Sequence, residues 1–127
     1  IHTMKIIATD KAPAAIGPYS QGTIHGDTVY CSGQIGLTSG GDWASTNVAG
    51  QAKQALLNLA AVLKAANSGP EHVLRATIFL ASMDDFAAVN EVYAEFFGQH
   101  RPARQCVEAQ RLPKDALVEI SVIAAIP

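Results

Sequence analysis

Two isolated charged side chains, Arg104 and Glu119, are the residues in this sequence whose types best suit chemistry. Arg104 lies in residues 102–108, where strand alternation puts Arg104 and Cys106 on the same side. Glu119 is the only carboxylate in the apolar run 117–125. Because a guanidinium clamps anions and an isolated carboxylate moves protons, we expect an anion site with an acid/base group beside it. A structural ion pair between Arg104 and Glu119 is the alternative interpretation.

The elements that carry these two side chains are expected to be strands joined by the short break at residues 111–116. Pro102 suits the start of the first strand, because proline cannot donate a ladder hydrogen bond. If the two strands pair as one hairpin, their register decides whether Arg104 and Glu119 share a face. If the two side chains face opposite ways, a subunit interface has to bring them together.

Cys106 has two interpretations, a nucleophile or a small polarizable wall of the anion site. No histidine has a sequence argument for partnering it, which favours the wall. His25, His72 and His100 do not show the spacing of metal ligands, so we expect no metal site.

The rest of the chain predicts strands and helices in a simple order. A strand at 5–8 and an irregular loop at 10–19 precede a hairpin at 22–32 that turns at Gly26-Asp27. A helix capped by Thr46 or Asn47 follows, then a strand at 73–81 that is apolar enough to be covered on both faces, and a second helix from residue 82. The expected buried positions of the two helices are Ala52, Leu56, Leu59, Leu63 and Ala66, and then Phe86, Val89, Tyr93 and Phe97.

This order predicts one α+β domain, residues 4–127, with two helices on one face of a mixed sheet. The chain has 127 residues, of which 49% are hydrophobic and 16% are charged, against roughly 25% charged in an average soluble domain. A sheet covered by helices on one side only, in a chain with few charges, indicates that partner subunits cover the other side.

The charge pattern and the cysteines bound the class of protein further. The net charge of −2 leaves no basic stripe for a phosphate backbone, which argues against nucleic-acid binding. Cys31 and Cys106 have no disulfide or CxxC pattern, so we expect reduced thiols in a cytoplasmic protein. Residues 1–3 are expected to be an expression remnant before Met4, and no apolar run is long enough to span a membrane.

Beyond these patterns, the sequence resembles the RidA family, also called YjgF or L-PSP, over nearly its whole length after Met4. Separate blocks in the right order carry the resemblance: 12–22 (APAAIGPYSQG), 32–35 (SGQI), 85–90 (DFAAVN), 102–108 (PARQCVE), 111–115 (RLPKD) and 118–120 (VEI). The resemblance implies a chorismate-mutase-like subunit that assembles as a homotrimer with pockets at the subunit interfaces. It also implies hydrolysis of 2-imino acids and their enamine tautomers, such as 2-aminoacrylate, to 2-keto acids and ammonia, without a cofactor.

Carried over residue by residue, the family's carboxylate-binding arginine falls on Arg104 and its acid/base carboxylate on Glu119. The remaining pocket positions of the pattern fall on Tyr19, Ser32, Gly33, Asn90 and Cys106. The resemblance also leaves two other functions open. One is an endoribonuclease acting on single-stranded RNA, and the other is a non-catalytic, chaperone-like trimer that binds small ligands.

Overall fold

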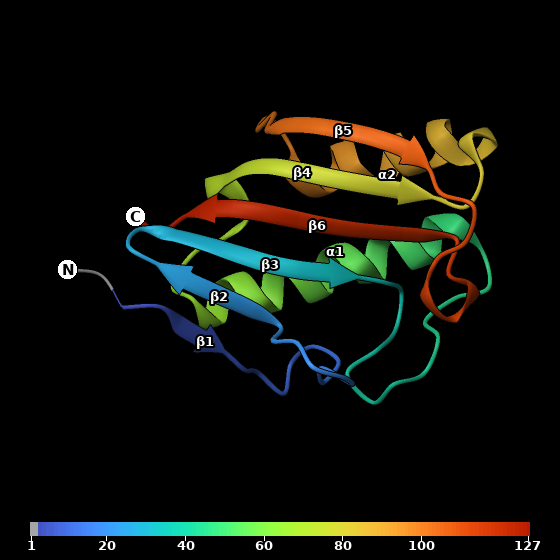
Figure 1. Cartoon of the computed structure of the whole chain (residues 1–127). Coiled ribbons are helices and arrows are strands. Elements are labelled where there is room, and N and C mark those ends of the chain that lie inside the picture. The colour runs from blue at the N-terminus through green and yellow to red at the C-terminus, as the bar shows by residue number, and fades with distance from the viewer. Residues whose placement is uncertain (1–2) are drawn as a thin grey trace.

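The computed structural model describes residues 3–127 as one six-stranded mixed sheet with two helices packed on one of its faces (Figure 1). This confirms the predicted α+β class. Residues 1 and 2, which belong to the expected expression remnant, lie outside the described residues. The elements are β1 (Lys5–Ile7), β2 (Gly22–His25), β3 (Thr28–Gln34), α1 (Val48–Ala65), β4 (Val73–Leu80), α2 (Phe86–Phe97), β5 (Ala103–Glu108) and β6 (Val118–Ala125).

The strand order in the sheet is β1-β2-β3-β6-β4-β5. All neighbouring strands are antiparallel except β4 and β5, which run parallel and are linked through α2. β5 and β6 do not pair as one hairpin, which was one of the arrangements left open by the sequence, because β4 lies between them. The physical reason lies in burial, since β6 alternates buried and half-buried residues and needs a central place, whereas the exposed β5 suits an edge.

Helix α1 begins and ends where its sequence indicates. The Asn47 side chain accepts a hydrogen bond of 2.8 Å from the backbone N–H of Gly50, and this caps the first turn. At the other end, Asn67 takes a left-handed conformation with φ of 60°, which stops the helix. All five predicted core positions of α1 are buried: Ala52, Leu56, Leu59, Leu63 and Ala66.

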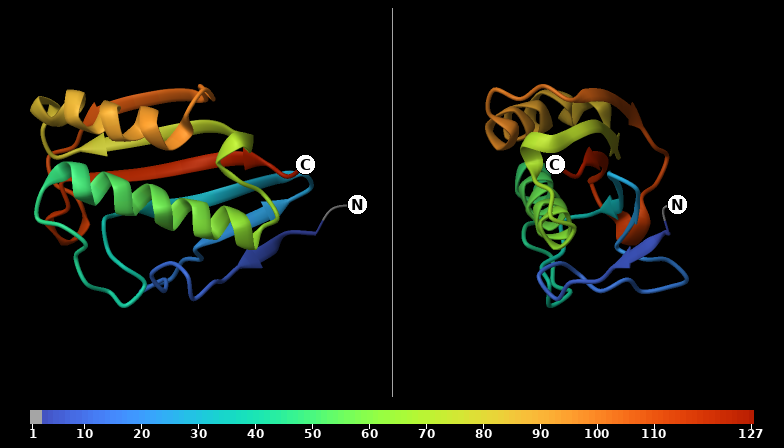
Figure 2. Two further views of the ribbon diagram at one scale, coloured as in Figure 1. Left: turned by 180° about the vertical axis from the view of Figure 1, so that it is seen from behind. Right: turned by 90° about the vertical axis from the view of Figure 1, so that its left-hand side faces the viewer.

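Helix α2 packs beside α1 on the same side of the sheet, as the view from behind shows (Figure 2). It follows a short 3-10 turn at Met83–Asp85, where the Ser82 side chain accepts a hydrogen bond from the backbone of Asp84. Val89, Tyr93 and Phe97 are buried as predicted, while Phe86 is half-buried.

The opposite face of the sheet, called the open face below, has no helix over it (Figures 1 and 2). Strand β4 is therefore buried only on its helix side within one chain, contrary to the expectation that both of its faces are covered. The open face exposes large apolar side chains on three strands, with Ile6 66%, Tyr30 47% and Val107 45% exposed. Among the described residues, no helix is both long and apolar enough to cross a membrane.

Candidate functional site

Arg104 projects from β5, the edge strand, toward the helices. It is paired with Ala76 of β4, which is fully buried, so strand alternation puts Arg104 on the helix side of the sheet. Its Nη1 donates a hydrogen bond of 2.7 Å to Oδ1 of Asn90 in α2. The guanidinium carbon lies 4.8 Å from the centre of the Tyr93 ring and 5.7 Å from the centre of the Phe86 ring.

No carboxylate neutralises Arg104 among residues 3–127, where the two ion pairs join other residues. Its neighbour on the same side of β5 is Cys106, two positions along the strand. Burial raises the pKa of the Cys106 thiol, and the charge of Arg104 lowers it by less. A thiol whose pKa is raised is mostly protonated at neutral pH, which favours the wall interpretation of Cys106 over the nucleophile.

Glu119 lies on the open face, since its neighbours Val118 and Ile120 in β6 point into the core under α1. Its carboxylate rests on the backbone of Gly33 in β3, so closely that a Cβ at Gly33 would stand 2.8 Å from Oε2 of Glu119. Partial burial raises the pKa of the Glu119 carboxyl above its ordinary value. A half-buried carboxyl with a raised pKa is suited to exchanging protons near neutral pH.

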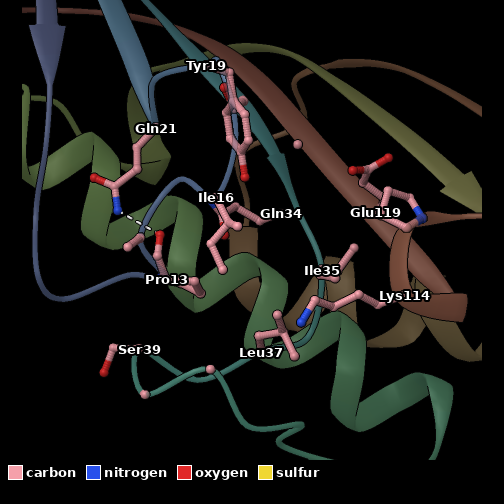
Figure 3. A pocket seen from close by; sticks show the side chains of 16 residues that line it. Pro13, Ile16, Tyr19, Gln21, Gln34, Ile35, Leu37, Ser39, Lys114 and Glu119 are labelled. Carbon is pink, nitrogen blue, oxygen red and sulfur yellow. Dashed lines mark hydrogen bonds between the residues drawn. The ribbon is translucent and has the colours of Figure 1, made fainter.

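A cavity of about 770 Å³ opens beside Glu119 and is mostly apolar (Figure 3). Its walls come from the loop 10–19, from the end of β3 and the loop after it, and from the turn before β6. The lining residues are Pro13, Ala14, Ile16, Tyr19, Gln21, Ser32, Gly33, Gln34, Ile35, Leu37, Ser39, Gly40, Gly41, Pro113, Lys114 and Glu119. Three of the predicted binding residues, Tyr19, Ser32 and Gly33, thus share one cavity with Glu119.

Tyr19 and Ser32 are held in place by backbone contacts. The backbone N–H of Tyr19 donates to the carbonyl of Gly17 at 2.9 Å, and Gly17 has a φ of 130° that a side chain would resist. Tyr19 is 55% exposed and lines the cavity (Figure 3). The Ser32 hydroxyl donates to the carbonyl of Ser20 at 2.5 Å, which ties β3 to the same loop.

Three buried amides that the sequence reading missed hold the walls of this cavity. Gln21 accepts from the backbone of Thr9 at 2.7 Å and donates to the carbonyl of Pro13 at 2.8 Å, which fixes the loop 10–19. Asn58 in α1 donates to the carbonyl of Leu37 at 2.8 Å. Gln51, one helical heptad earlier, accepts from the backbone of Leu117 at 2.9 Å. Gln51 and Asn58 could have been found from the sequence, because two amides seven residues apart interrupt the apolar stripe of α1.

The predicted site residues therefore form two groups on different faces of the sheet. Asn90, Arg104 and Cys106 lie on the helix side at the β5 edge, and we call them the arginine group. The second set, Tyr19, Ser32, Gly33 and Glu119, lines the cavity on the open face, and we call it the glutamate group. Arg104 and Glu119 of one chain form no ion pair, so the alternative interpretation is wrong within a single chain. Within residues 3–127, no three His, Cys, Asp or Glu side chains cluster as metal ligands.

Comparison of the chain with known proteins identifies a family that it matches. The family described as Endoribonuclease L-PSP matches residues 9–126. A protein of Bos taurus named 2-iminobutanoate/2-iminopropanoate deaminase is 47% identical over 94% of this chain and 88% of its own length.

Solved structures agree with this match. The YjgF gene product of E. coli has a TM-score of 0.93 and 43% identity, covering 97% of this chain and 99% of its own. E. coli TdcF, solved with bound serine, has a TM-score of 0.91 and 42% identity, covering 95% of this chain and 98% of its own. Identity at this level over nearly the whole length establishes common descent as well as a common fold. The chain therefore belongs to the endoribonuclease L-PSP family, which is also called the RidA or YjgF family.

Proposed function

We propose that this protein hydrolyses 2-imino acids and their enamine tautomers, such as 2-aminoacrylate, to 2-keto acids and ammonia. The site is made where the arginine group of one subunit meets the glutamate group of the next in a homotrimer. The observation that carries the proposal is the pair of incomplete groups, with an uncompensated arginine on one and a half-buried carboxyl beside a cavity on the other. Relatives named as imine deaminases at 45–47% identity support the reaction class.

Arg104 is assigned the carboxylate of the substrate. Its planar fork makes two charge-assisted hydrogen bonds to one carboxylate, which the single ammonium of a lysine cannot copy. Arg104 is exposed, and within residues 3–127 its side chain is hydrogen-bonded only to the neutral amide of Asn90, so its remaining donors are free for a ligand. TdcF, a relative solved with bound serine, supports a small ligand with an α-carboxylate for this family of sites.

Glu119 is assigned the role of activating the attacking water and transferring protons. The terminal carbon of an enamine first takes a proton, which gives the 2-imine. Glu119 then accepts a proton from a water whose oxygen attacks C2, and it gives that proton to the nitrogen of the resulting carbinolamine. The C–N bond breaks and ammonia leaves, while the hydroxyl loses its proton to solvent and becomes the keto oxygen. The 2-keto acid remains, so one water is consumed for each ammonia released. The imine carbon is already electrophilic, so positioning and polarisation supply the rate gain and no cofactor takes part.

A second copy of the chain is the partner that completes the site. The open face exposes Ile6, Tyr30 and Val107, an apolar surface of the kind that subunit contacts bury. The glutamate group lies on that face, and the arginine group lies at the β5 edge that borders it. We assign the protein to the cytoplasm, where its two free cysteines stay reduced.

The test generates 2-aminoacrylate from serine with a pyridoxal-phosphate-dependent dehydratase and follows the appearance of pyruvate. Wild type is expected to exceed spontaneous hydrolysis, and Arg104→Lys to lose roughly a hundredfold of that acceleration, because one ammonium cannot orient the carboxylate. Arg111→Lys is the matched control, since Arg111 pairs with Asp115 on the surface at 2.7 Å. No acceleration by a folded oligomer, together with cleavage of single-stranded RNA, would replace this proposal with the ribonuclease function.

A further inference from the structure

We propose that Phe86 and Tyr93 are positioning residues that hold the guanidinium of Arg104 against their ring faces, in place of a counter-ion, so that its charge stays available to a ligand carboxylate. The inference rests on the proposed role of Arg104 as the substrate clamp. It concerns two aromatic side chains that the sequence marks only as core positions of α2.

Three side chains of α2 contact the guanidinium of Arg104 because of their spacing along the helix. Phe86, Asn90 and Tyr93 are four and three residues apart, so their side chains follow one another along a single helix face. That face meets the edge strand at Arg104. Asn90 accepts a hydrogen bond from Nη1 at 2.7 Å, and the two rings lie 4.8 Å and 5.7 Å from the guanidinium carbon. Both distances are within the reach of a cation–π contact.

The ring of Tyr93 packs against Phe97 and contacts the guanidinium of Arg104. Its side chain is 6% exposed, and its ring packs on that of Phe97 with a centroid separation of 4.6 Å. Its hydroxyl is buried without a hydrogen-bond partner among the described residues. A hydroxyl bond therefore does not hold the ring in place, and the aromatic face is the part of Tyr93 that Arg104 uses.

The choice of aromatic partners has an electrostatic consequence. An Asp or Glu beside Arg104 would form an ion pair and would compete with any incoming carboxylate. A ring face attracts the cation without supplying an acceptor oxygen that would compete with a ligand for the N–H groups. Among the described residues the hydrogen bond to Asn90 is the one that the Arg104 side chain makes, so its other N–H groups stay available to a ligand.

The experiment measures the clamp without turnover. The probe is 2-oxobutanoate, a stable 2-keto carboxylate, titrated against the assembled protein with the side-chain Nε–H resonance of Arg104 as reporter. That resonance is assigned by its loss in Arg104→Lys. The variants are Tyr93→Leu, Phe86→Leu and Tyr93→Phe. Val89→Ala is the control, because Val89 is buried on the same helix and has no aromatic ring to face Arg104.

Tyr93→Leu and Phe86→Leu are expected to shift the Arg104 resonance downfield by removing a ring current, and to weaken 2-oxobutanoate binding by roughly threefold to thirtyfold. Tyr93→Phe keeps the ring, so both the resonance and the affinity are expected to stay at wild-type values. Val89→Ala is expected to lower stability while leaving both readouts unchanged.

One further variant keeps the proposal testable if the leucine variants do not fold. Asn90→Asp places a carboxylate against Nη1, and it is expected to weaken 2-oxobutanoate binding at least tenfold in a protein that stays folded. Unchanged affinity in Asn90→Asp, or wild-type affinity and resonance in Tyr93→Leu, would overturn the inference. Failure of the deaminase reaction with these binding results intact would overturn the proposed function and leave the positioning role standing.

Discussion

Arg104 and Glu119 lie in the same sheet but on opposite faces of it, and β4 separates the two strands that carry them. The guanidinium of Arg104 rests on α2, whereas the carboxylate of Glu119 rests on Gly33 across the open face. One substrate cannot touch both side chains of a single chain in this arrangement. For this reason the proposed site takes one group from each of two chains.

Replacing Glu119 by Gln tests its role in moving protons. The variant is expected to bind 2-oxobutanoate like wild type and to lose about a hundredfold to ten-thousandfold in turnover, because an amide cannot accept the proton of water. Burial raises the pKa of Glu119, so wild-type activity should fall at acid pH with an apparent pKa above that of an ordinary Glu. A pH–rate profile of kcat/KM measures this fall at acid pH. If the same fall is found in Glu119→Gln, Glu119 has no part in the mechanism.

The same raised pKa predicts how the stability of the fold depends on pH. Folding favours the protonated form of Glu119, so its contribution is full below the pKa of the unfolded chain and is lost as pH rises through the raised value. Glu119→Gln stays neutral throughout. The free energy of unfolding by urea should therefore be nearly equal for the two proteins at acid pH and higher for the variant at neutral pH. Measurements at one protein concentration test this, and a difference that stays constant with pH would contradict it.

Gly33 is expected to tolerate no side chain, because Glu119 occupies that space. A Cβ there would stand 2.8 Å from Oε2, so Gly33→Ala should displace the carboxylate and reduce turnover on the order of tenfold to a hundredfold. Gly40 lines the same cavity, and a Cβ on it would meet its nearest atom at 3.8 Å, which makes Gly40→Ala the matched control. Steady-state rates of the two variants decide the point, and equal losses would show that Gly33 has no special part.

Cys106 is expected to be dispensable for chemistry. Burial raises the pKa of its thiol, so Cys106→Ser should keep turnover within about threefold of wild type.

Cys31 is buried in the core with a pKa raised to about 12, so it should resist thiol reagents until the chain unfolds. Turnover by Cys106→Ser and thiol titration before and after denaturation measure both expectations. A loss of turnover in Cys106→Ser as large as that expected for Glu119→Gln would restore the interpretation of Cys106 as a nucleophile.

Local patterns were enough to predict the elements of this fold. The Asn47 cap, the Gly26 turn and the apolar stripes of α1 and α2 act within a few residues of one another, and the structure confirms them. The order of strands could not be read in the same way, because the place of β6 between β3 and β4 depends on pairing between residues far apart in sequence.

For the site, the sequence suggests a chemistry that stays a prediction, and it does not reveal the contacts that support the two charged side chains. The types of Arg104 and Glu119 indicate a clamp and a proton shuttle by themselves. The contacts that hold them come from elsewhere in the chain, such as the Tyr93 ring under Arg104 and the Gly33 backbone under Glu119. A buried aromatic has the same sequence pattern whether it fills the core or carries a cation, so only the fold separates the two roles.

Mixing two inactive variants tests the shared site most directly. Arg104→Ala chains keep an intact glutamate group, and Glu119→Gln chains keep an intact arginine group. After equal amounts are unfolded together and reassembled, about one interface in four should combine the two intact groups and recover about a quarter of wild-type turnover of 2-aminoacrylate. Mixing Arg104→Ala with Arg104→Lys, followed by the same treatment, should recover nothing. Recovery only in the first mixture supports a site built from two chains, and no recovery in hybrids whose mixed composition is shown by native mass spectrometry would contradict it.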